Sequence, residues 1–231
     1  MGAGHGQLFV VSGPSGSGKS TVVAHVVRAV PDMIFSVSYT TRPPRAGEQD
    51  GRDYRFVTRA AFEQMLARSE FLEHAEVFAN YYGTHQSVLA EAARQQKDVV
   101  LDIDVEGTRQ VKSRLADAVA VLLLPPSAPE LEQRLRGRAL DTAEGMRLRL
   151  ERARHEIENY NIYDYLVVNR VLAETCAAVE AIVQAERLRR AGRPPGSGQA
   201  RDWEERAAAA RRDNNKSQVS AILETFGAQR P

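Results

Sequence analysis

A glycine-rich segment near the N-terminus has the residue types and spacing of a phosphate-binding loop. It fits the pattern G-x-x-x-x-G-K-[ST] with the residues Gly13, Pro14, Ser15, Gly16, Ser17, Gly18, Lys19 and Ser20. An apolar run over residues 8–11 precedes the loop and valines at helical spacing follow it, which predicts the strand–loop–helix context of this motif. Because the N–H groups of such a loop point into one concavity at a helix N-terminus, we expect it to bind a nucleoside triphosphate.

Two side chains of this loop are expected to do most of its chemistry. Lys19 would contact the β- and γ-phosphates, the Ser20 hydroxyl would be a ligand of Mg²⁺, and the adjacent Thr21 is included among the triphosphate-binding residues. The alternative is a glycine-rich turn that binds nothing. A D-x-x-G sequence at residues 104–107 also occurs in GTPases, but their guanine-reading N-K-x-D sequence is missing, which argues against a GTPase.

A stiff, cationic loop follows the first predicted helix. Residues 36–48, SVSYTTRPPRAGE, place Arg42 and Arg45 three residues apart beside two prolines. Arginine suits phosphate because its guanidinium donates two parallel hydrogen bonds, and Tyr54 could add a neutral donor. The loop therefore indicates a second phosphate site, with a merely solvated loop as the alternative.

Two carboxylates lie at the end of the predicted strand 99–103. Asp102 and Asp104 are two residues apart, so we expect both side chains on one face, at the edge where open parallel sheets bind ligands. An apolar strand should not carry two carboxylates without partners, so we expect them to face a nucleotide cleft, where they would contact nucleotide or water around Mg²⁺. For Asp104, capping of the next helix is the alternative.

The elements that must position these residues alternate between strands and helices. Such alternation predicts an α/β fold with a mostly parallel sheet. The predicted strands are 8–11, 34–38, 54–57, 99–103, 119–124 and 166–168. The predicted helices are 19–30, 59–68, 86–96, 105–115, 127–136, 143–161 and 172–190.

Composition separates the C-terminus from the rest of the chain. The 231 residues carry a net charge of +1, but residues 188–231 hold nine Lys or Arg against five Asp or Glu. Residues 191–200 contain two prolines and three glycines and predict a linker. In the extension 201–231, Val219, Ile222, Leu223 and Phe226 have helical spacing, so it could dock on the core, mediate homo-oligomer formation or bind an acidic partner. Its charge is too small to indicate nucleic acid.

Other features of the composition exclude several classes of protein. One cysteine excludes an internal disulfide framework. No apolar run has the length of a membrane span and no signal peptide is recognisable, so we expect no membrane association and a cytoplasmic location.

Seven motifs follow one another along the chain. They are the phosphate-binding loop, residues 36–48, DGRDY at 50–54, FLE at 71–73, NYYGT at 80–84, LDIDVEG at 101–107 and PPS at 125–127. Their order resembles that of the bacterial guanylate kinase family, over roughly residues 8–187. The resemblance implies a P-loop nucleoside-monophosphate-kinase fold within residues 1–190. Its core would be about 6–37, 85–124 and 162–190, with a GMP-binding insert at about 38–84 and a helical lid at about 125–161.

The resemblance also implies phosphoryl transfer from ATP to GMP, with Mg²⁺ and with dGMP as a further acceptor. The residues that would bind GMP are Ser38, Arg42, Arg45, Tyr54, Glu73, Tyr82, Thr84, Asp102 and Asp104. Glu73 would read guanine, whose N1–H and 2-amino group are two adjacent donors that match a carboxylate, whereas adenine presents an acceptor at N1. Asn169 would lie near the adenine of ATP.

Arginines of the predicted lid would stabilise the charge of the transferring phosphoryl group. By family position these are Arg134, Arg138 and Arg149, which with Lys19 are the expected catalytic residues. The alternative functions are a non-catalytic guanylate-kinase-like binding module and a kinase of the same fold that acts on a phosphorylated sugar. The chain departs from the family pattern at Ala79, where glycine is more usual, and we expect no effect unless that position needs a positive φ.

Overall fold

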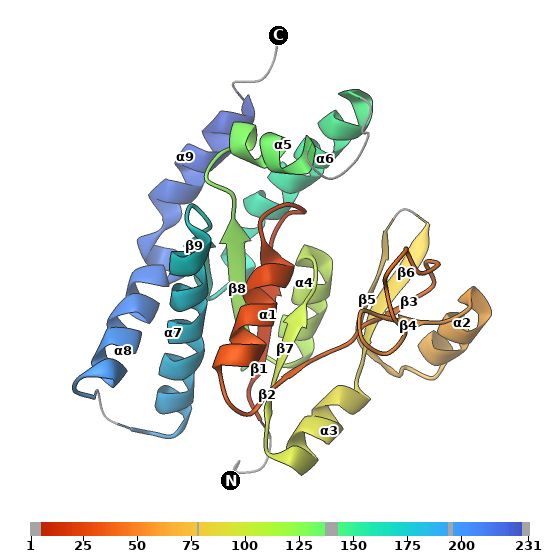
Figure 1. Ribbon diagram of the computed structural model, residues 1–231, viewed down its shortest axis with the longest axis horizontal. Helices are drawn as coiled ribbons and strands as arrows, with labels where there is room; N and C mark the ends of the chain where they lie inside the picture. Colours follow the sequence, from red (N-terminus) through yellow and green to blue (C-terminus); the bar gives the residue numbers. More distant parts are fainter. Residues whose placement is uncertain (1–5, 78, 137–142, 194–195, 228–231) are drawn as a thin grey trace.

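A parallel sheet of five strands forms the centre of the molecule, in a computed structural model that describes residues 6–77, 79–136, 143–193 and 196–227 (Figure 1). The strand order is β2-β7-β1-β8-β9. The strands are β1 (Leu8–Ser12), β2 (Met33–Phe35), β7 (Asp98–Asp102), β8 (Val119–Leu124) and β9 (Tyr165–Val168). The predicted α/β class is confirmed, and β8 has the predicted bounds.

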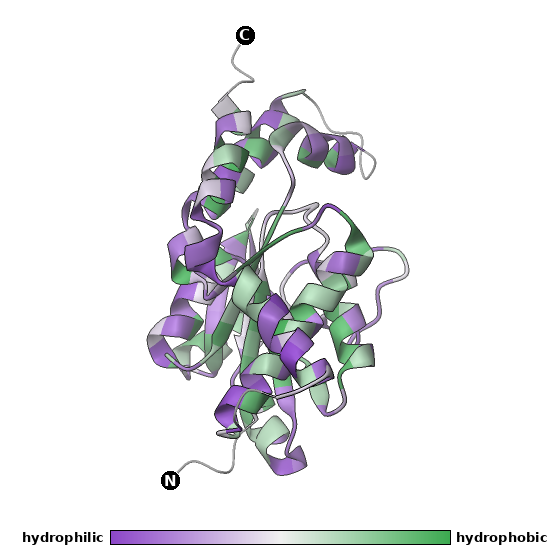
Figure 2. Cartoon of the chain, turned by 90° about the vertical axis from the view of Figure 1, so that its left-hand side faces the viewer, coloured by the Kyte–Doolittle hydropathy of each residue, from purple (hydrophilic) through white to green (hydrophobic). Residues whose placement is uncertain are grey.

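Side chains of the central strands alternate between two apolar cores. In β1, Phe9 and Val11 point into a core that helices α1 (Lys19–Ala29) and α7 (Leu172–Arg190) cover. Leu8 and Val10 point into a second core, to which α3 (Ser87–Gln95) and α4 (Val105–Arg114) contribute. Helices therefore cover both faces of the parallel sheet and shield them from water. In Figure 2 the helices carry both hydrophobic and hydrophilic residues.

A smaller sheet lies beside α4, away from the central sheet (Figure 1). Its strand order is β4-β3-β6-β5, with β5 (Phe71–Val77) and β6 (Asn80–His85) antiparallel. β3 (Tyr39–Thr40) and β4 (Arg55–Phe56) complete it, and α2 (Arg59–Ala67) follows β4 in the chain. The sequence did not predict β3, β5 or β6, because Glu73, His74 and Glu76 interrupt the apolar alternation of β5.

The C-terminal part of the chain forms helices that pack on the core. After α5 (Ala128–Arg136), α6 (Ala143–Glu158) ends three residues before the predicted limit and a 3-10 turn, Tyr160–Ile162, follows it. Helix α8 (Gln199–Ala210) was not predicted and begins inside the expected linker, whereas α9 (Lys216–Gly227) contains the predicted apolar stripe. No helix among the described residues is long and apolar enough to cross a membrane.

The turn between β5 and β6 contains a strained alanine. Ala79 has a φ of 61°, in the left-handed region that costs a residue with a Cβ about 1–2 kcal/mol. From the sequence we expected alanine to have no effect here unless the position has a positive φ. Because φ is positive, alanine does have a cost at this position. The hairpin therefore stores strain next to the strands that carry Glu73 and Thr84.

Ala79→Gly is expected to raise the free energy of unfolding by up to about 1 kcal/mol, because glycine adopts this φ without the Cβ clash. The measurement is urea unfolding at equilibrium. Ala75→Gly is the matched control, since Ala75 lies in β5 outside the left-handed region and its replacement should destabilise. Equal effects of the two variants would contradict the strain at Ala79.

Candidate functional site

The carboxyl ends of the parallel strands gather the polar residues that the sequence singled out. Gly13 follows β1, Asp102 ends β7 and Asn169 follows β9. Parallel strands all end at the same edge of a sheet, where open α/β sheets bind their ligands. The carboxyl edge of the sheet therefore brings together residues as distant in the sequence as Gly13 and Asn169, which are 156 positions apart.

The glycine-rich loop leaves the N-terminus of α1 open to an anion. Its N-cap, Gly18, has a φ of 95° and supplies no side-chain cap. The Lys19 ammonium donates to the carbonyls of Gly13 and Pro14 at 2.6 and 3.3 Å. Backbone donors, a helix N-terminus and an ammonium group thus converge in the way that binds phosphate.

Asn169 holds this loop against β9 and α7. Its side-chain amide donates to the Ser17 carbonyl at 2.8 Å, and its Oδ1 accepts from the Thr175 hydroxyl at 3.1 Å. A Cβ at Gly18 would lie 2.4 Å from the same amide nitrogen, so only glycine allows this close approach. The Asn169 carbonyl also accepts from Arg134 of α5 at 2.8 Å, which brings that predicted cation to the loop.

Asp102 joins the phosphate-binding loop to the rest of the site. The Ser20 hydroxyl donates to its Oδ2 at 3.1 Å. Burial raises the pKa of Asp102, and the positive charge of Lys19 opposes that rise. A hydroxyl and a carboxylate oxygen at this separation fit Mg²⁺, which prefers oxygen ligands and takes few of them from the protein when phosphates supply others.

Glu73 and Thr84 form a buried pair across the β5–β6 hairpin. The two residues face each other in register, and the Thr84 hydroxyl donates to Glu73 Oε1 at 2.6 Å. Glu73 is 4% exposed, and burial raises the pKa of its carboxyl to about 7. The Thr84 hydrogen bond offsets part of this rise, and the nearby Asp104 adds to it.

Helix α4 fixes the position of Glu73 from the other side. A Cβ at Gly107 would lie 2.6 Å from Glu73 Oε2, so glycine provides the space for the carboxylate. One turn on, the Gln110 side chain donates to the His74 carbonyl at 2.7 Å and accepts from its N–H at 3.1 Å. Arg114 donates to the carbonyls of Phe71 and Leu72 at 2.6 and 2.7 Å. One face of α4 therefore anchors β5, a role that the sequence did not reveal.

Arg42, in the loop before β4, lies among an acidic residue and two tyrosines. Arg42 pairs with Glu48 at 2.9 Å, and its guanidinium lies 5.4 Å from the centre of the Tyr54 ring. The Tyr54 and Tyr82 rings meet edge to face at 5.9 Å. Burial raises the pKa of Tyr54, and the charge of Asp102 raises it further, so Tyr54 stays a neutral donor. Glu48, which the sequence did not assign to the site, holds Arg42 in place.

Asp104 contacts both α4 and α6. It is the N-cap of α4, where its side chain accepts from the Gly107 N–H at 2.9 Å, and it pairs with Arg152 of α6 at 3.3 Å. Arg152 also approaches Glu156 Oε1 at 3.4 Å, and Glu156 Oε2 is buried without a hydrogen-bond partner. Burial raises the pKa of Glu156 to about 7, which the charge of Lys19 partly opposes. Strand β7 ends at Asp102, so Asp104 does not share its strand face, and the capping alternative is confirmed.

The remaining predicted residues are less closely tied to this edge. Ser38 accepts from the Arg55 N–H through its backbone carbonyl at 2.9 Å, and Thr21 is exposed on α1. Arg45 is exposed, and its backbone N–H donates to Glu48 at 2.7 Å. Arg149 lies on α6, half-buried, while Arg138 falls outside the described residues.

Comparisons with known proteins agree on one family. The family model described as "Guanylate kinase" matches residues 5–186. A protein of Koribacter versatilis named guanylate kinase is 47% identical over 96% of this chain and 96% of its own. One of Paramagnetospirillum magneticum with the same name is 49% identical over 80% of this chain and 87% of its own. The crystal structure of guanylate kinase from Anaplasma phagocytophilum is 33% identical, covers 79% of this chain and 87% of its own, and superposes with a TM-score of 0.66. The match to the Koribacter protein necessarily includes most of residues 201–231, which the family model does not reach.

The free energy of unfolding is expected to fall as the pH rises from about 4.5 to 7. The native carboxyls of Glu73 and Glu156 have pKa values of about 7, so they bind protons that the unfolded chain releases in this range. Each contributes roughly 1.4 kcal/mol per unit of pKa difference. Glu73→Gln should reduce this slope in urea unfolding between pH 5 and 8.

Glu63→Gln is the control for this titration, because Glu63 is exposed on α2. A slope that is the same in the wild type, Glu73→Gln and Glu63→Gln would contradict the raised pKa of Glu73.

Proposed function

Because the chain belongs to the guanylate kinase family, we propose that the residues described above transfer the γ-phosphoryl group of ATP to GMP, giving ADP and GDP. The observation that carries this assignment of residues is a buried carboxylate–hydroxyl pair, Glu73 and Thr84, in the same protein as a phosphate-binding loop whose Ser20 hydroxyl donates to Asp102. Two nucleotides would lie end to end, with Asp102 between them.

GMP would be recognised at its base and at its phosphate by different groups. Ionised Glu73 accepts from guanine N1–H and the 2-amino group, while Thr84 keeps the carboxylate oriented. Ser38 would assist at the base, Asp102 would contact GMP where the two nucleotides meet, and Asp104 supports the site from the start of α4. Arg42, Arg45, Tyr54 and Tyr82 donate to the phosphate, with Arg42 aligned by Glu48. The same contacts accept dGMP, since none of them requires the 2′-hydroxyl.

ATP would be held by the loop and by the start of α1. Backbone N–H groups of the loop bind the phosphates, and Lys19 exchanges its contacts with Gly13 and Pro14 for phosphate oxygens. Asn169 keeps the loop in place near the adenine. Ser20 would hold Mg²⁺ with Asp102 acting directly or through water, and the ion would neutralise charge on the β- and γ-phosphates.

Catalysis would come from cations that surround the transferring group. Its transition state spreads negative charge over three oxygens, so fixed positive groups lower the barrier without a dedicated general base. We assign this role to Lys19 and to three arginines of the lid, the segment 125–161, namely Arg134, Arg138 and Arg149. Arg134 already reaches Asn169, beside the loop.

Lys19→Ala is expected to lower kcat by about 10³-fold or more, because it removes charge that stabilises the transition state. The dissociation constant for GMP should change by no more than about threefold, since in this account Lys19 contacts ATP only. Coupled assays of ADP release and calorimetry with GMP measure the two quantities. Arg28→Ala, at the exposed end of α1, is the control. Loss of GMP binding along with turnover would contradict the placement of the two sites.

Glu73→Gln is expected to reduce the preference for GMP over AMP by roughly 10²-fold, because an amide presents a donor where guanine needs an acceptor. The ratio of kcat/KM for the two acceptors measures this preference. Glu76→Gln, an exposed change on the same strand, should leave the ratio unchanged. An unchanged ratio in Glu73→Gln would rule out Glu73 as the reader of guanine.

A further inference from the structure

The last two helices connect the two ends of the lid. Helix α8 runs along α7 and buries Ala207 and Ala210 in the first core, while α9 continues towards α5 and α6 (Figure 1). We name this segment, residues 199–227, the C-terminal brace. The lid leaves the central sheet after β8 and returns to it before β9, and the brace contacts the chain near both of these points.

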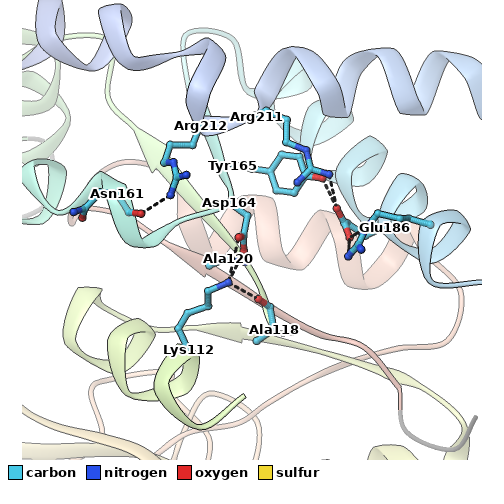
Figure 3. A network of polar contacts seen from close by, with 10 residues as sticks. Lys112, Ala118, Ala120, Asn161, Asp164, Tyr165, Glu186, Arg211 and Arg212 are labelled. Carbon is cyan, nitrogen blue, oxygen red and sulfur yellow. Dashed lines mark hydrogen bonds and ion pairs between the residues drawn. The ribbon is translucent and has the colours of Figure 1, made fainter. Parts of the chain in front are cut away.

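At the returning end, the turn between α8 and α9 is held by charged side chains (Figure 3). Arg211 pairs with the buried Glu186 at 3.0 Å and stacks over the Tyr165 ring at 4.4 Å. The Arg212 N–H donates to the Asp164 carbonyl at 3.0 Å, and its guanidinium donates to the Asn161 carbonyl at 2.6 Å. Asn161 is the last residue of the lid, so this end of the lid is tied to the brace.

At the departing end, α9 completes the N-terminus of α5. The Thr225 hydroxyl accepts from the N–H of Ala128, the first residue of α5, at 2.9 Å. The first N–H groups of a helix have no partner within the helix, and an external acceptor stabilises its start. In the same turn, the Ser127 hydroxyl accepts from the Glu130 N–H at 3.3 Å. The start of α5 therefore has one acceptor from the residue that precedes it and one from the brace.

Apolar contacts extend this support to both lid helices. Phe226 packs against a cluster that contains Leu131 and Leu135 of α5 and Met146 of α6. Val219 and Ile222 are fully buried in the second core with Ile157, near the end of α6. The same two leucines of α5, Leu131 and Leu135, also lie against Gly16 of the phosphate-binding loop.

We infer that the C-terminal brace is a positioning element for phosphoryl transfer, with Thr225 as its positioning residue. It holds the start of α5 so that Arg134, on the same helix, stays beside the phosphate-binding loop. This inference rests on the proposed roles of the lid arginines. It concerns residues that lie beyond the segment matched by the family model, so it is specific to chains with this extension.

Thr225→Val tests this inference, because valine keeps the branched shape and removes only the hydroxyl. We expect kcat for GMP phosphorylation to fall about three- to tenfold, as for the loss of a helix-capping acceptor. The KM for GMP should stay within about twofold, because the main contacts of the brace among the described residues are with α5, α6, α7 and β9, away from the proposed GMP site. Hydrogen exchange of the α5 amides should accelerate relative to those of α7.

Ser220→Ala is the matched control, since among the described residues the Ser220 hydroxyl donates to the Lys216 carbonyl within α9 and to no residue of α5 or α6. A merely structural role would lower the melting temperature and the fraction of folded protein and leave turnover per folded molecule unchanged. An unchanged or increased kcat in Thr225→Val, with the wild type active, overturns the inference. An inactive wild type would instead contradict the proposed function.

Discussion

The burial of the Glu73 carboxyl is the constraint on which the rest of the site depends. An ionised carboxylate away from water is costly unless donors satisfy it. Among the described residues, Thr84 donates to Glu73, and the charge of Arg114 also favours the ionised form. The carboxyl consequently holds its proton up to about neutral pH. A base that offers two adjacent donors makes the ionised form favourable, so binding energy and specificity come from the same interaction. A base without those donors leaves the cost of ionisation uncompensated.

Several residues of α4 make room for this buried carboxyl or hold the strand that carries it. Gly107 leaves space for the carboxylate, and the Gln110 and Arg114 side chains hold β5 against α4. The same helix begins at Asp104, which Arg152 connects to α6 of the lid. Glu73, the proposed reader of the base, the edge of the central sheet and α6 of the proposed lid are therefore all linked to α4. A change in the position of α4 would alter base recognition and lid position together.

Sequence patterns predicted the strands and helices whose hydrophobic pattern lies entirely within their own segment. The continuous apolar run of β8 and the long helix α7 have the predicted bounds, and the phosphate-binding loop lies between the predicted strand and helix. The β5–β6 hairpin was not predicted, because its polar residues pair across strands and with α4, which local periodicity does not encode. Glu156 and Arg152 resemble ordinary solvent-facing charges of a helix, and only the packing of α6 on the core buries Glu156. Helix α8 follows a glycine- and proline-rich stretch that favoured a linker, and its alanines become core residues only against α7.

The titration of the Glu73 carboxyl by carbon-13 NMR, with and without GMP, tests this account most directly. In the ligand-free protein we expect a pKa of about 7. With saturating GMP the pKa should fall below about 5, because two donors then stabilise the ionised form. A pKa near 4.5 in the ligand-free protein, or a pKa that GMP leaves unchanged, would contradict the central role of this buried carboxylate.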